Sequence, residues 1–302
     1  MSRRLILFSL FMIIAAVLLL MPLPISPTYA GQTIENAGHT PLFAIGTLFV
    51  MLVLRHDFHV DGVRRYVFAG AIGAAAGLVS EAIQQPFHRD ASWEDVFADT
   101  VGVVLALAVV ACVDRWAEPR RLLRAFMVCI ALGCIAVYVE PLVNMTRAYV
   151  YRSGQFPALA TFDSRLALYW LVNYGSRSEI RDGRLEVEFE ASKYPGVSFF
   201  EPVPDWRGFH TLVVDVENPD ADLLNLVIRV HDIGHGNAYS DRFNRSFKLA
   251  PGERRVFEIG LADVQHAPRN RLMNMAQISD VTLFRVRDSG SNHLRLYSIR
   301  LK

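Results

Sequence analysis

The sequence predicts a multi-domain membrane protein, in which an all-α bundle of five transmembrane helices precedes an all-β jelly-roll sandwich. Of the 302 residues, 52% are hydrophobic and 20% are charged, and the mean hydropathy is +0.24, which disfavours an ordinary soluble enzyme. Residues 1–143 carry 10 Arg, no Lys and 11 Asp or Glu, whereas residues 144–302 carry 21 Lys or Arg and 19 Asp or Glu. Beyond residue 160, the apolar periodicity changes from helical to alternating.

The first 143 residues contain five apolar segments, and each is predicted to be a transmembrane helix. They cover residues 5–25, 41–54, 66–84, 96–113 and 125–143. A span needs about 20 apolar residues, within a range of about 17–25. The second segment is short unless its helix extends back through His39. Five core helices of a soluble domain would need polar faces that these segments lack.

The arginines predict the orientation of these helices. Nine of the ten arginines lie before the first segment, between the second and third, or between the fourth and fifth; only Arg89 lies in the other loops. Positively charged loops remain in the cytoplasm. We therefore expect a bacterial-type inner-membrane protein with a cytoplasmic N-terminus and an extracytoplasmic C-terminal domain. The first segment is expected to be a retained anchor, but its start also has the features of a cleavable signal peptide.

Polar residues occur near the outer ends of the predicted helices. Glu81 and Gln84 are three residues apart, so they are predicted to share one helix face. Ionisable groups within a span are costly and usually face a partner or a cavity. Arg89 is the expected counter-charge, as the one arginine of the outer loops. The predicted membrane-face cluster comprises His39, Glu81, Gln84, Arg89, Asp95 and Asp99.

This cluster resembles the pattern of the VanZ-like membrane proteins over roughly residues 5–113. The matching residues are Asn36 and His39, Glu81-x-x-Gln84, Arg89, Asp95, Asp99 and Gly102. The family pattern has Asp and Asn where this chain has Asn36 and Asp99, so the local charge differs. The resemblance implies an envelope protein, and the founding member of the family is linked to teicoplanin resistance.

The membrane-face cluster has three alternative interpretations. It can be an ion-pair network that ties helix ends together, because buried charges are also retained for that purpose. It can bind a lipid-linked headgroup. It can also be catalytic, with Glu81, Arg89 and Asp95 acting on a lipid-linked substrate. The sequence has no nucleophile elbow, paired metal ligands or glycine-rich phosphate loop, so no metal or other cofactor is expected.

Eight segments in the second half are predicted to be strands. They cover residues 184–190, 197–201, 209–217, 223–230, 242–249, 254–259, 278–286 and 293–301. Alternation of Val214 and Val216 with Asp215 and Glu217 predicts one buried and one solvated face. The expected domain organisation is a membrane domain at 1–143, a juxtamembrane linker at 144–160 and an exported sandwich at 161–302.

Polar residues of the exported half concentrate in one predicted strand–loop–strand unit. Their planar donors, carboxylates and aromatic ring suit a glycan, because sugars are bound by aromatic faces and directed hydrogen bonds. A metal site at His231 and His235 is disfavoured, because this segment is predicted to be strand and loop rather than helix. Alternatively, Asp241 and Arg242 pair to brace the loop. The glycan-binding candidates are Arg229, His231, Asp232, His235, Tyr239, Asp241, Arg242 and Asn244.

The exported half resembles galactose-binding-like sandwiches of the carbohydrate-binding-module type over roughly residues 162–302. The resemblance is carried by Asp205-Trp206-Arg-Gly-Phe209, Leu212-Val-Val-Asp-Val216, Arg229-Val-His231-Asp232, Tyr239-x-Asp241-Arg242-Phe243 and Pro251-Gly252. It implies the sandwich fold more directly than it implies sugar binding, because one fold hosts unrelated functions.

These observations together predict a non-catalytic envelope protein. Its partners are expected to be the lipid bilayer and an envelope polysaccharide or lipid-linked glycan precursor. The sequence pI of about 7.8 and the lack of a basic tract disfavour a nucleic-acid partner. The alternatives are a membrane enzyme that uses Glu81, Arg89 and Asp95, or a structural module that docks a partner protein through Tyr239 and Arg242.

Overall fold

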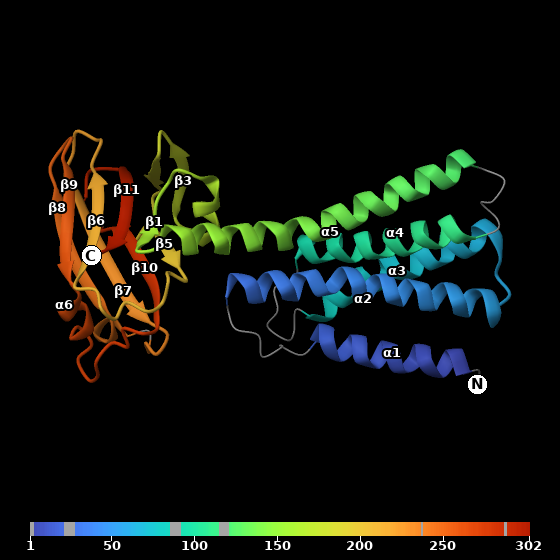
Figure 1. The fold of residues 1–302 in the computed structure, drawn as a ribbon. Helices are drawn as coiled ribbons and strands as arrows, with labels where there is room; N and C mark the ends of the chain where they lie inside the picture. Colours follow the sequence, from blue (N-terminus) through green and yellow to red (C-terminus); the bar gives the residue numbers. More distant parts are fainter. Residues whose placement is uncertain (1–2, 21–27, 85–91, 115–120, 237, 287–288) are drawn as a thin grey trace. The chain divides into compact units, whose positions relative to one another are not determined.

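The computed structural model describes residues 3–20, 28–84, 92–114, 121–236, 238–286 and 289–302. The chain divides into two compact units, residues 1–145 and residues 146–302 (Figure 1). The first unit is helical and the second is an antiparallel β-sandwich. The prediction of an N-terminal helical region followed by a C-terminal sandwich is therefore confirmed.

The helical unit is built from long apolar helices. Their bounds are α1 Arg3–Leu20, α2 Tyr29–His56, α3 Gly62–Gln84, α4 Trp93–Val113 and α5 Arg121–Gln155. In the described part of the chain, four of them, α2 to α5, are long and apolar enough to cross a membrane. The prediction of five spans is corrected to four candidates. Helix α1 has 18 residues and starts with two arginines, so its apolar stretch falls below the usual minimum of about 17 residues.

Helix α2 begins well before the apolar segment at 41–54. The side chain of Thr28 caps it by accepting a hydrogen bond from the Gly31 N–H at 3.0 Å. The helix then runs through Pro41. His39 therefore lies inside a 28-residue helix rather than at its boundary, and its side chain is buried.

Helices α2 and α4 approach each other closely. A Cβ atom at Gly102 of α4 would lie 2.3 Å from the carbonyl oxygen of Thr40 in α2, so only glycine fits there. At the same level, the Thr40 hydroxyl donates to the carbonyl oxygen of Ala98 at 3.0 Å. This contact fixes the register between the two helices and places His39 beside Asp99.

Helix α5 corrects the predicted juxtamembrane linker at 144–160. The helix continues without a break to Gln155, and strand β1 follows at Ala158–Ala160. The last part of α5 could not be predicted from apolar periodicity, because it contains polar residues such as Asn144 and Arg147.

The sandwich consists of two antiparallel sheets. The remaining strands are β2 Leu171–Tyr174, β3 Ser176–Arg181, β4 Arg184–Phe189, β5 Gly196–Phe200, β6 Thr211–Glu217, β7 Leu224–Asp232, β8 Phe243–Leu249, β9 Arg254–Gly260, β10 Ile278–Arg285 and β11 His293–Leu301. One sheet has the order β3-β4-β11-β6-β9, with β1 beside β11. The other, called sheet B here, has the order β2-β5-β10-β7-β8.

Apolar side chains from both sheets meet in one core. Trp206, Leu212, Leu226 and Ile259 are among its fully buried members. On β7, core residues such as Leu226 and Ile228 alternate with outward-facing Arg229 and its neighbours, as the pleat of a strand requires. Burial of the inward-facing side chains fixes the register of the strands. The outward face of sheet B carries polar and aromatic side chains.

Candidate functional site

The outward face of sheet B is organised in three rows that cross the strands. Residues directly opposite one another in an antiparallel pair point to the same side of the sheet. The first row is Tyr174, Gly196, Phe284, Val227 and Ser246. The second row is Val172, Ser198, Thr282, Arg229 and Asn244, and the third contains Phe200, Asp280 and His231. We call this surface the sheet B face.

A buried polar cluster lies at the centre of the sheet B face. The hydroxyls of Ser198 and Thr282 both donate to the carboxylate of Asp280, and the two hydroxyl oxygens lie 3.3 Å apart. All three side chains are buried. Burial raises the pKa of Asp280, because it disfavours the charged form, although the two hydroxyl donors oppose this effect.

Arg229 and His231 lie beside this cluster on β7. The guanidinium of Arg229 stacks over the Phe284 ring at 4.6 Å from its centroid, and its Nε donates to Asn244 Oδ1 at 3.1 Å. His231 Nε2 lies 3.8 Å from Asp280 Oδ1, and the His231 and His235 rings are 4.0 Å apart. Burial lowers the pKa of His231, and the positive charges of Arg229 and Arg242 lower it further. These side chains are therefore held in fixed positions with a neutral imidazole at pH 7.

Three exposed tyrosines border the sheet B face. Tyr174, Tyr194 and Tyr239 are 53%, 54% and 72% exposed. The Tyr194 ring packs edge-on against Phe284 with 5.9 Å between the centroids. Gly196 separates Tyr174 from Phe284 in the first row, and a Cβ there would lie 2.5 Å from Phe284 Cβ. The glycine therefore lets the aromatic side chains sit close to the backbone of the sheet.

Two of the predicted glycan-binding residues share one arginine as their partner. Asp232 and Asp241 are both held by Arg271, whose Nη1 donates to Asp232 Oδ2 at 2.6 Å and whose Nε donates to Asp241 Oδ1 at 2.6 Å. The alternative pairing of Asp241 with Arg242 is wrong for the same reason. Asp232 is fully buried and also accepts a hydrogen bond from the Asn274 N–H. The two carboxylates brace the loop through Arg271, and their predicted part in glycan binding stays a prediction.

The remaining predicted residues lie around the sheet B face. His235 stacks on His231, and the Asn244 amide donates to the carbonyl oxygen of Tyr239 at 3.5 Å. Arg242 Nε is buried and makes no hydrogen bond within the part of the chain that the structure describes. Tyr174, Ser198, Asp280, Thr282 and Phe284 were missed, because they reach this face by strand pairing with distant segments. Their alternation with core residues was the only available signal.

The chemistry of the sheet B face favours binding over hydrolysis. Asp280 is the only carboxylate in its three rows, whereas most glycoside hydrolases use two carboxylates about 5–9.5 Å apart. Exposed aromatic rings next to planar donors match the way proteins bind sugars. The face therefore has the groups of a binding surface.

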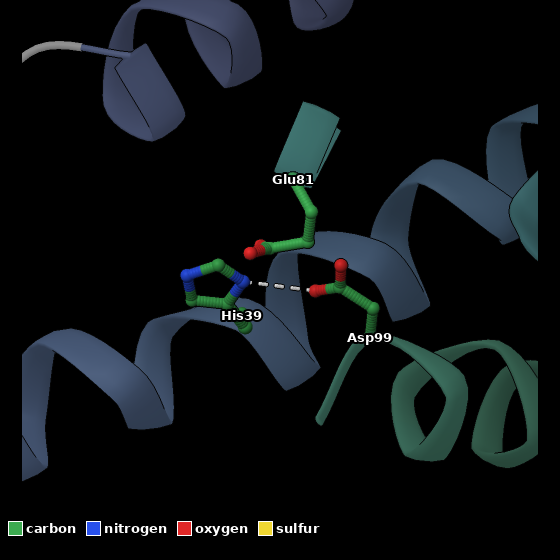
Figure 2. Close-up of side chains that lie close together, drawn as sticks. All are labelled: His39, Glu81 and Asp99. Carbon is green, nitrogen blue, oxygen red and sulfur yellow. Dashed lines mark hydrogen bonds and ion pairs between the residues drawn. The ribbon is translucent and has the colours of Figure 1, made fainter. Parts of the chain in front are cut away.

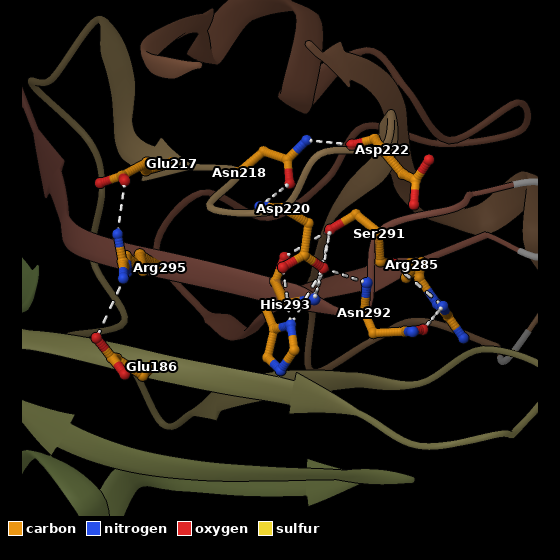
Figure 3. A network of polar contacts seen from close by, with 10 residues as sticks. All are labelled: Glu186, Glu217, Asn218, Asp220, Asp222, Arg285, Ser291, Asn292, His293 and Arg295. Carbon is orange, nitrogen blue, oxygen red and sulfur yellow. Dashed lines mark hydrogen bonds and ion pairs between the residues drawn. The ribbon is translucent and has the colours of Figure 1, made fainter. Parts of the chain in front are cut away.

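The other sheet carries a separate polar network at one end (Figure 3). Asp220 accepts hydrogen bonds from the Ser291 hydroxyl and from the backbone N–H groups of Asn292 and His293. Burial opposes ionisation of Asp220, but these donors, together with the His293 side chain, hold its pKa below the ordinary value. Arg295 links Glu217 to Glu186 across three strands. The polar groups of this network pair with one another, and their contacts join the loops to the sheet.

The structure brings together three members of the predicted membrane-face cluster. His39, Glu81 and Asp99 are buried side by side, and Asp95 is half-buried one turn before Asp99 (Figure 2). Gln84 is the last residue of α3, but its side chain and all of Arg89 lie outside the described residues. The predicted counter-charge role of Arg89 therefore stays a prediction.

Comparisons with known proteins give structural likenesses only. No family model matches the chain, so the VanZ-like resemblance has no support from that comparison, and no curated protein matches it. A family 11 carbohydrate-binding module from Clostridium thermocellum, solved with a β-1,3-1,4-mixed-linked tetrasaccharide, is 14% identical over 48% of this chain and 93% of that one, with a TM-score of 0.37. A family 29 module from Piromyces equi is 12% identical over 44% and 80%, with a TM-score of 0.30.

An agarase is also among the similar structures. It is 17% identical over 48% of this chain, with a TM-score of 0.40. This chain covers 26% of that agarase and 24% of an exo-β-agarase, about a quarter of the length of each. What these proteins bind or cleave is a property of those proteins.

Proposed function

We propose that this protein is anchored in the bacterial inner membrane and binds an acidic cell-envelope glycan through the sheet B face, without cleaving it. The observation that carries the proposal is the presence of three exposed tyrosines at the face that bears Arg229, His231 and Asp280. Aromatic rings supply stacking surfaces for sugar rings, and the planar donors between them supply directed hydrogen bonds.

The charge of the face favours an acidic sugar. Arg229 and Arg242 both approach it, and Arg242 Nε has no hydrogen-bond acceptor among the described residues. Asp232 and Asp241 are both paired with Arg271, so together they offset only one positive charge beyond that arginine. Asp280 is buried and faces two hydroxyl donors. A carboxylate or other anionic group on the glycan would pair with the two arginines.

The membrane location is supported by the helices themselves. Four of them are long and apolar enough to span a bilayer, and large apolar side chains point outward, such as Val67, Phe68 and Leu78 of α3. Contiguous apolar surface of this extent is unfavourable in water and favourable in lipid. The distribution of arginines supports an extracytoplasmic sandwich, where it would meet an envelope glycan.

Affinity electrophoresis tests glycan binding with the full chain in detergent micelles. We expect a gel containing polygalacturonate to retard the protein more than one containing a neutral mixed-linkage glucan. Tyr174→Ala should weaken binding about two- to ten-fold, because an aromatic contact contributes about 0.5–1.5 kcal/mol. Arg229→Gln should weaken it at least as much, since hydrogen bonds to charged groups contribute about 1.5–3 kcal/mol.

The matched control is Arg177→Gln, because Arg177 is an exposed arginine on β3 of the other sheet. It should bind like the unmodified protein. Retardation by neither polysaccharide, or retardation of Tyr174→Ala and Arg229→Gln equal to that of the unmodified protein, would contradict the proposal. Near-ultraviolet circular dichroism of each variant establishes that the sandwich is folded.

A further inference from the structure

Three helices of the first unit bring one imidazole and two carboxylates to a single point. His39 comes from α2, Glu81 from α3 and Asp99 from α4, and one ligand atom from each lies within 4.8 Å of the others. His39 Nδ1 and Asp99 Oδ1 are 2.9 Å apart. Figure 2 shows the Glu81 carboxylate pointing toward the His39 ring and the Asp99 carboxylate.

Within the part of the chain that the structure describes, two oxygens of this group are buried without a partner. His39, Glu81 and Asp99 are only 4%, 5% and 2% exposed. Glu81 Oε2 accepts a hydrogen bond from the Ser92 N–H at 2.9 Å, but Glu81 Oε1 has no partner among the described residues, and neither has Asp99 Oδ2. An unpaired buried carboxylate oxygen is costly, so two of them in one buried group with a histidine favour a bound cation.

The surrounding backbone holds these side chains in place. Gly77 of α3 packs under Asp99, since a Cβ there would lie 3.2 Å from Asp99 Oδ2. Gly102 brings α4 against α2 at the level of Thr40, the neighbour of His39. Ser92 caps α4 and holds Glu81 through its N–H. The geometry is therefore set by packing, which is the condition for a preformed site.

We propose that His39, Glu81 and Asp99 bind one divalent transition-metal ion, with Zn²⁺ the best match, and leave a fourth position open for water. One imidazole nitrogen and two carboxylate oxygens are ligands that Zn²⁺ accepts, and three protein ligands with an open position are typical of reactive zinc sites. With bonds of about 2.1 Å, tetrahedral ligands lie about 3.4 Å apart. The His39–Asp99 pair at 2.9 Å would therefore open slightly, and atoms up to 4.8 Å apart would move closer when the ion binds.

The site escapes sequence inspection because its ligands come from three different helices. The familiar zinc motifs place ligands a few residues apart in one segment. Here, only the packing of α2, α3 and α4 brings the three residues together. The ion would replace the proton that links His39 to Asp99, so binding should release a proton and strengthen as the pH rises.

Metal loading of the full chain in lipid nanodiscs tests the proposal. After incubation with Zn²⁺ and removal of loosely held metal, we expect one equivalent of zinc by mass spectrometry and a higher unfolding temperature. Co²⁺ in the same site should give visible absorption bands of a nitrogen–oxygen ligand field. His39→Gln, Glu81→Gln and Asp99→Asn should each weaken Zn²⁺ binding roughly ten-fold or more.

The matched controls are His56→Gln and Glu94→Gln, because both side chains are exposed on the same helices, α2 and α4. They should retain one equivalent of zinc. Asp99→Asn keeps the size of the side chain, so a folded variant that loses the metal supports direct ligation. Less than about one tenth of an equivalent in the unmodified protein, or undiminished binding in all three ligand variants, would overturn the proposal. Glycan binding by the sandwich is unaffected by either result.

Discussion

Arg271 joins two carboxylates that belong to different parts of the sandwich. Its side chain donates to Asp232 at the end of β7 and to Asp241 in the following loop. Asp232 is fully buried, and burial opposes its ionisation, but the hydrogen bonds from Arg271 and from the Asn274 N–H hold its pKa below the ordinary 3.8. The arginine is thus the main reason why this carboxylate can stay charged inside the protein.

We predict that Arg271→Ala lowers the free energy of unfolding of residues 146–302 by about 2–4 kcal/mol at pH 7, because the buried Asp232 loses its partner. Asp232 is ionised with a lowered pKa, so its contribution is complete above pH 3.8 and is lost as the pH falls through the lower folded value. The difference between the two proteins should therefore shrink in acid.

Urea titrations at pH 7 and pH 3 measure this difference. Arg177→Ala is the control, because Arg177 makes an exposed ion pair with Glu190 that contributes little. An Arg271→Ala protein as stable as the unmodified protein at pH 7 would contradict the assigned role.

At the residue scale, the sequence predicted the strand that bears Arg229, ending one residue before His231, but it did not predict the partners of these two residues. Asp280 and Tyr174 lie about 50 residues away along the chain on either side, and strand pairing alone brings them to the same face. Arg271 was missed because its segment has no regular periodicity. Asp232 was predicted to bind a glycan because the sequence does not distinguish a carboxylate that binds a ligand from one that braces a loop through an ion pair.

At the element scale, Gly102 controls the approach of α2 and α4. A Cβ there would meet the Thr40 carbonyl oxygen at 2.3 Å and the Ala44 nitrogen at 3.0 Å, and both are backbone atoms that cannot rotate away. We predict that Gly102→Ala destabilises the helical unit by about 1–3 kcal/mol, as overpacking does elsewhere. It should also weaken Zn²⁺ binding by separating His39 from Asp99.

The unfolding temperature of the full chain in detergent measures the effect of Gly102→Ala. Gly133→Ala in α5 is the matched control, because nothing lies within 4 Å of a Cβ at that position. It should leave stability unchanged or raise it slightly, since alanine favours helix more than glycine does. Equal unfolding temperatures of Gly102→Ala and Gly133→Ala would contradict the close approach of α2 and α4.

All eight predicted strands are present with shifts of a few residues at their ends. Three further strands were missed for physical reasons. Strand β1 has three residues and β2 has four, too few to show a period. Strand β3, Ser176–Arg181, carries five polar or charged residues on an edge of its sheet, so it lacks the apolar alternation of a buried strand.

At the scale of the whole molecule, the number of membrane crossings determines where the chain ends lie. Four spans place the start of α2 and the end of α5 on the same side, whereas five spans that include α1 place the two termini on opposite sides. The arginine distribution predicts a cytoplasmic N-terminus and an external C-terminus, which requires an odd number. The described helices supply four candidate spans, so this orientation depends on whether the chain before Tyr29 also crosses the membrane.

Reporter fusions test whether the chain crosses the membrane an odd or an even number of times. Alkaline phosphatase fused after Lys302 should be active, because it folds only outside the cytoplasm, and green fluorescent protein fused before Met1 should fluoresce. Fluorescence with inactive phosphatase would mean that the C-terminus stays inside and would contradict the predicted orientation. Active phosphatase without fluorescence would mean that α1 does not cross or that the N-terminal segment is removed.

The rows of the sheet B face have a further consequence for the kind of molecule that fits. Neighbouring strands lie about 4.8 Å apart, close to the advance of one sugar ring along an extended polysaccharide. A linear polymer laid across the five strands of sheet B would therefore meet one strand per sugar, with the same row position recurring at each step. The spacing between the hydrogen-bonded strands would therefore favour a polysaccharide whose sugars repeat at about the same interval.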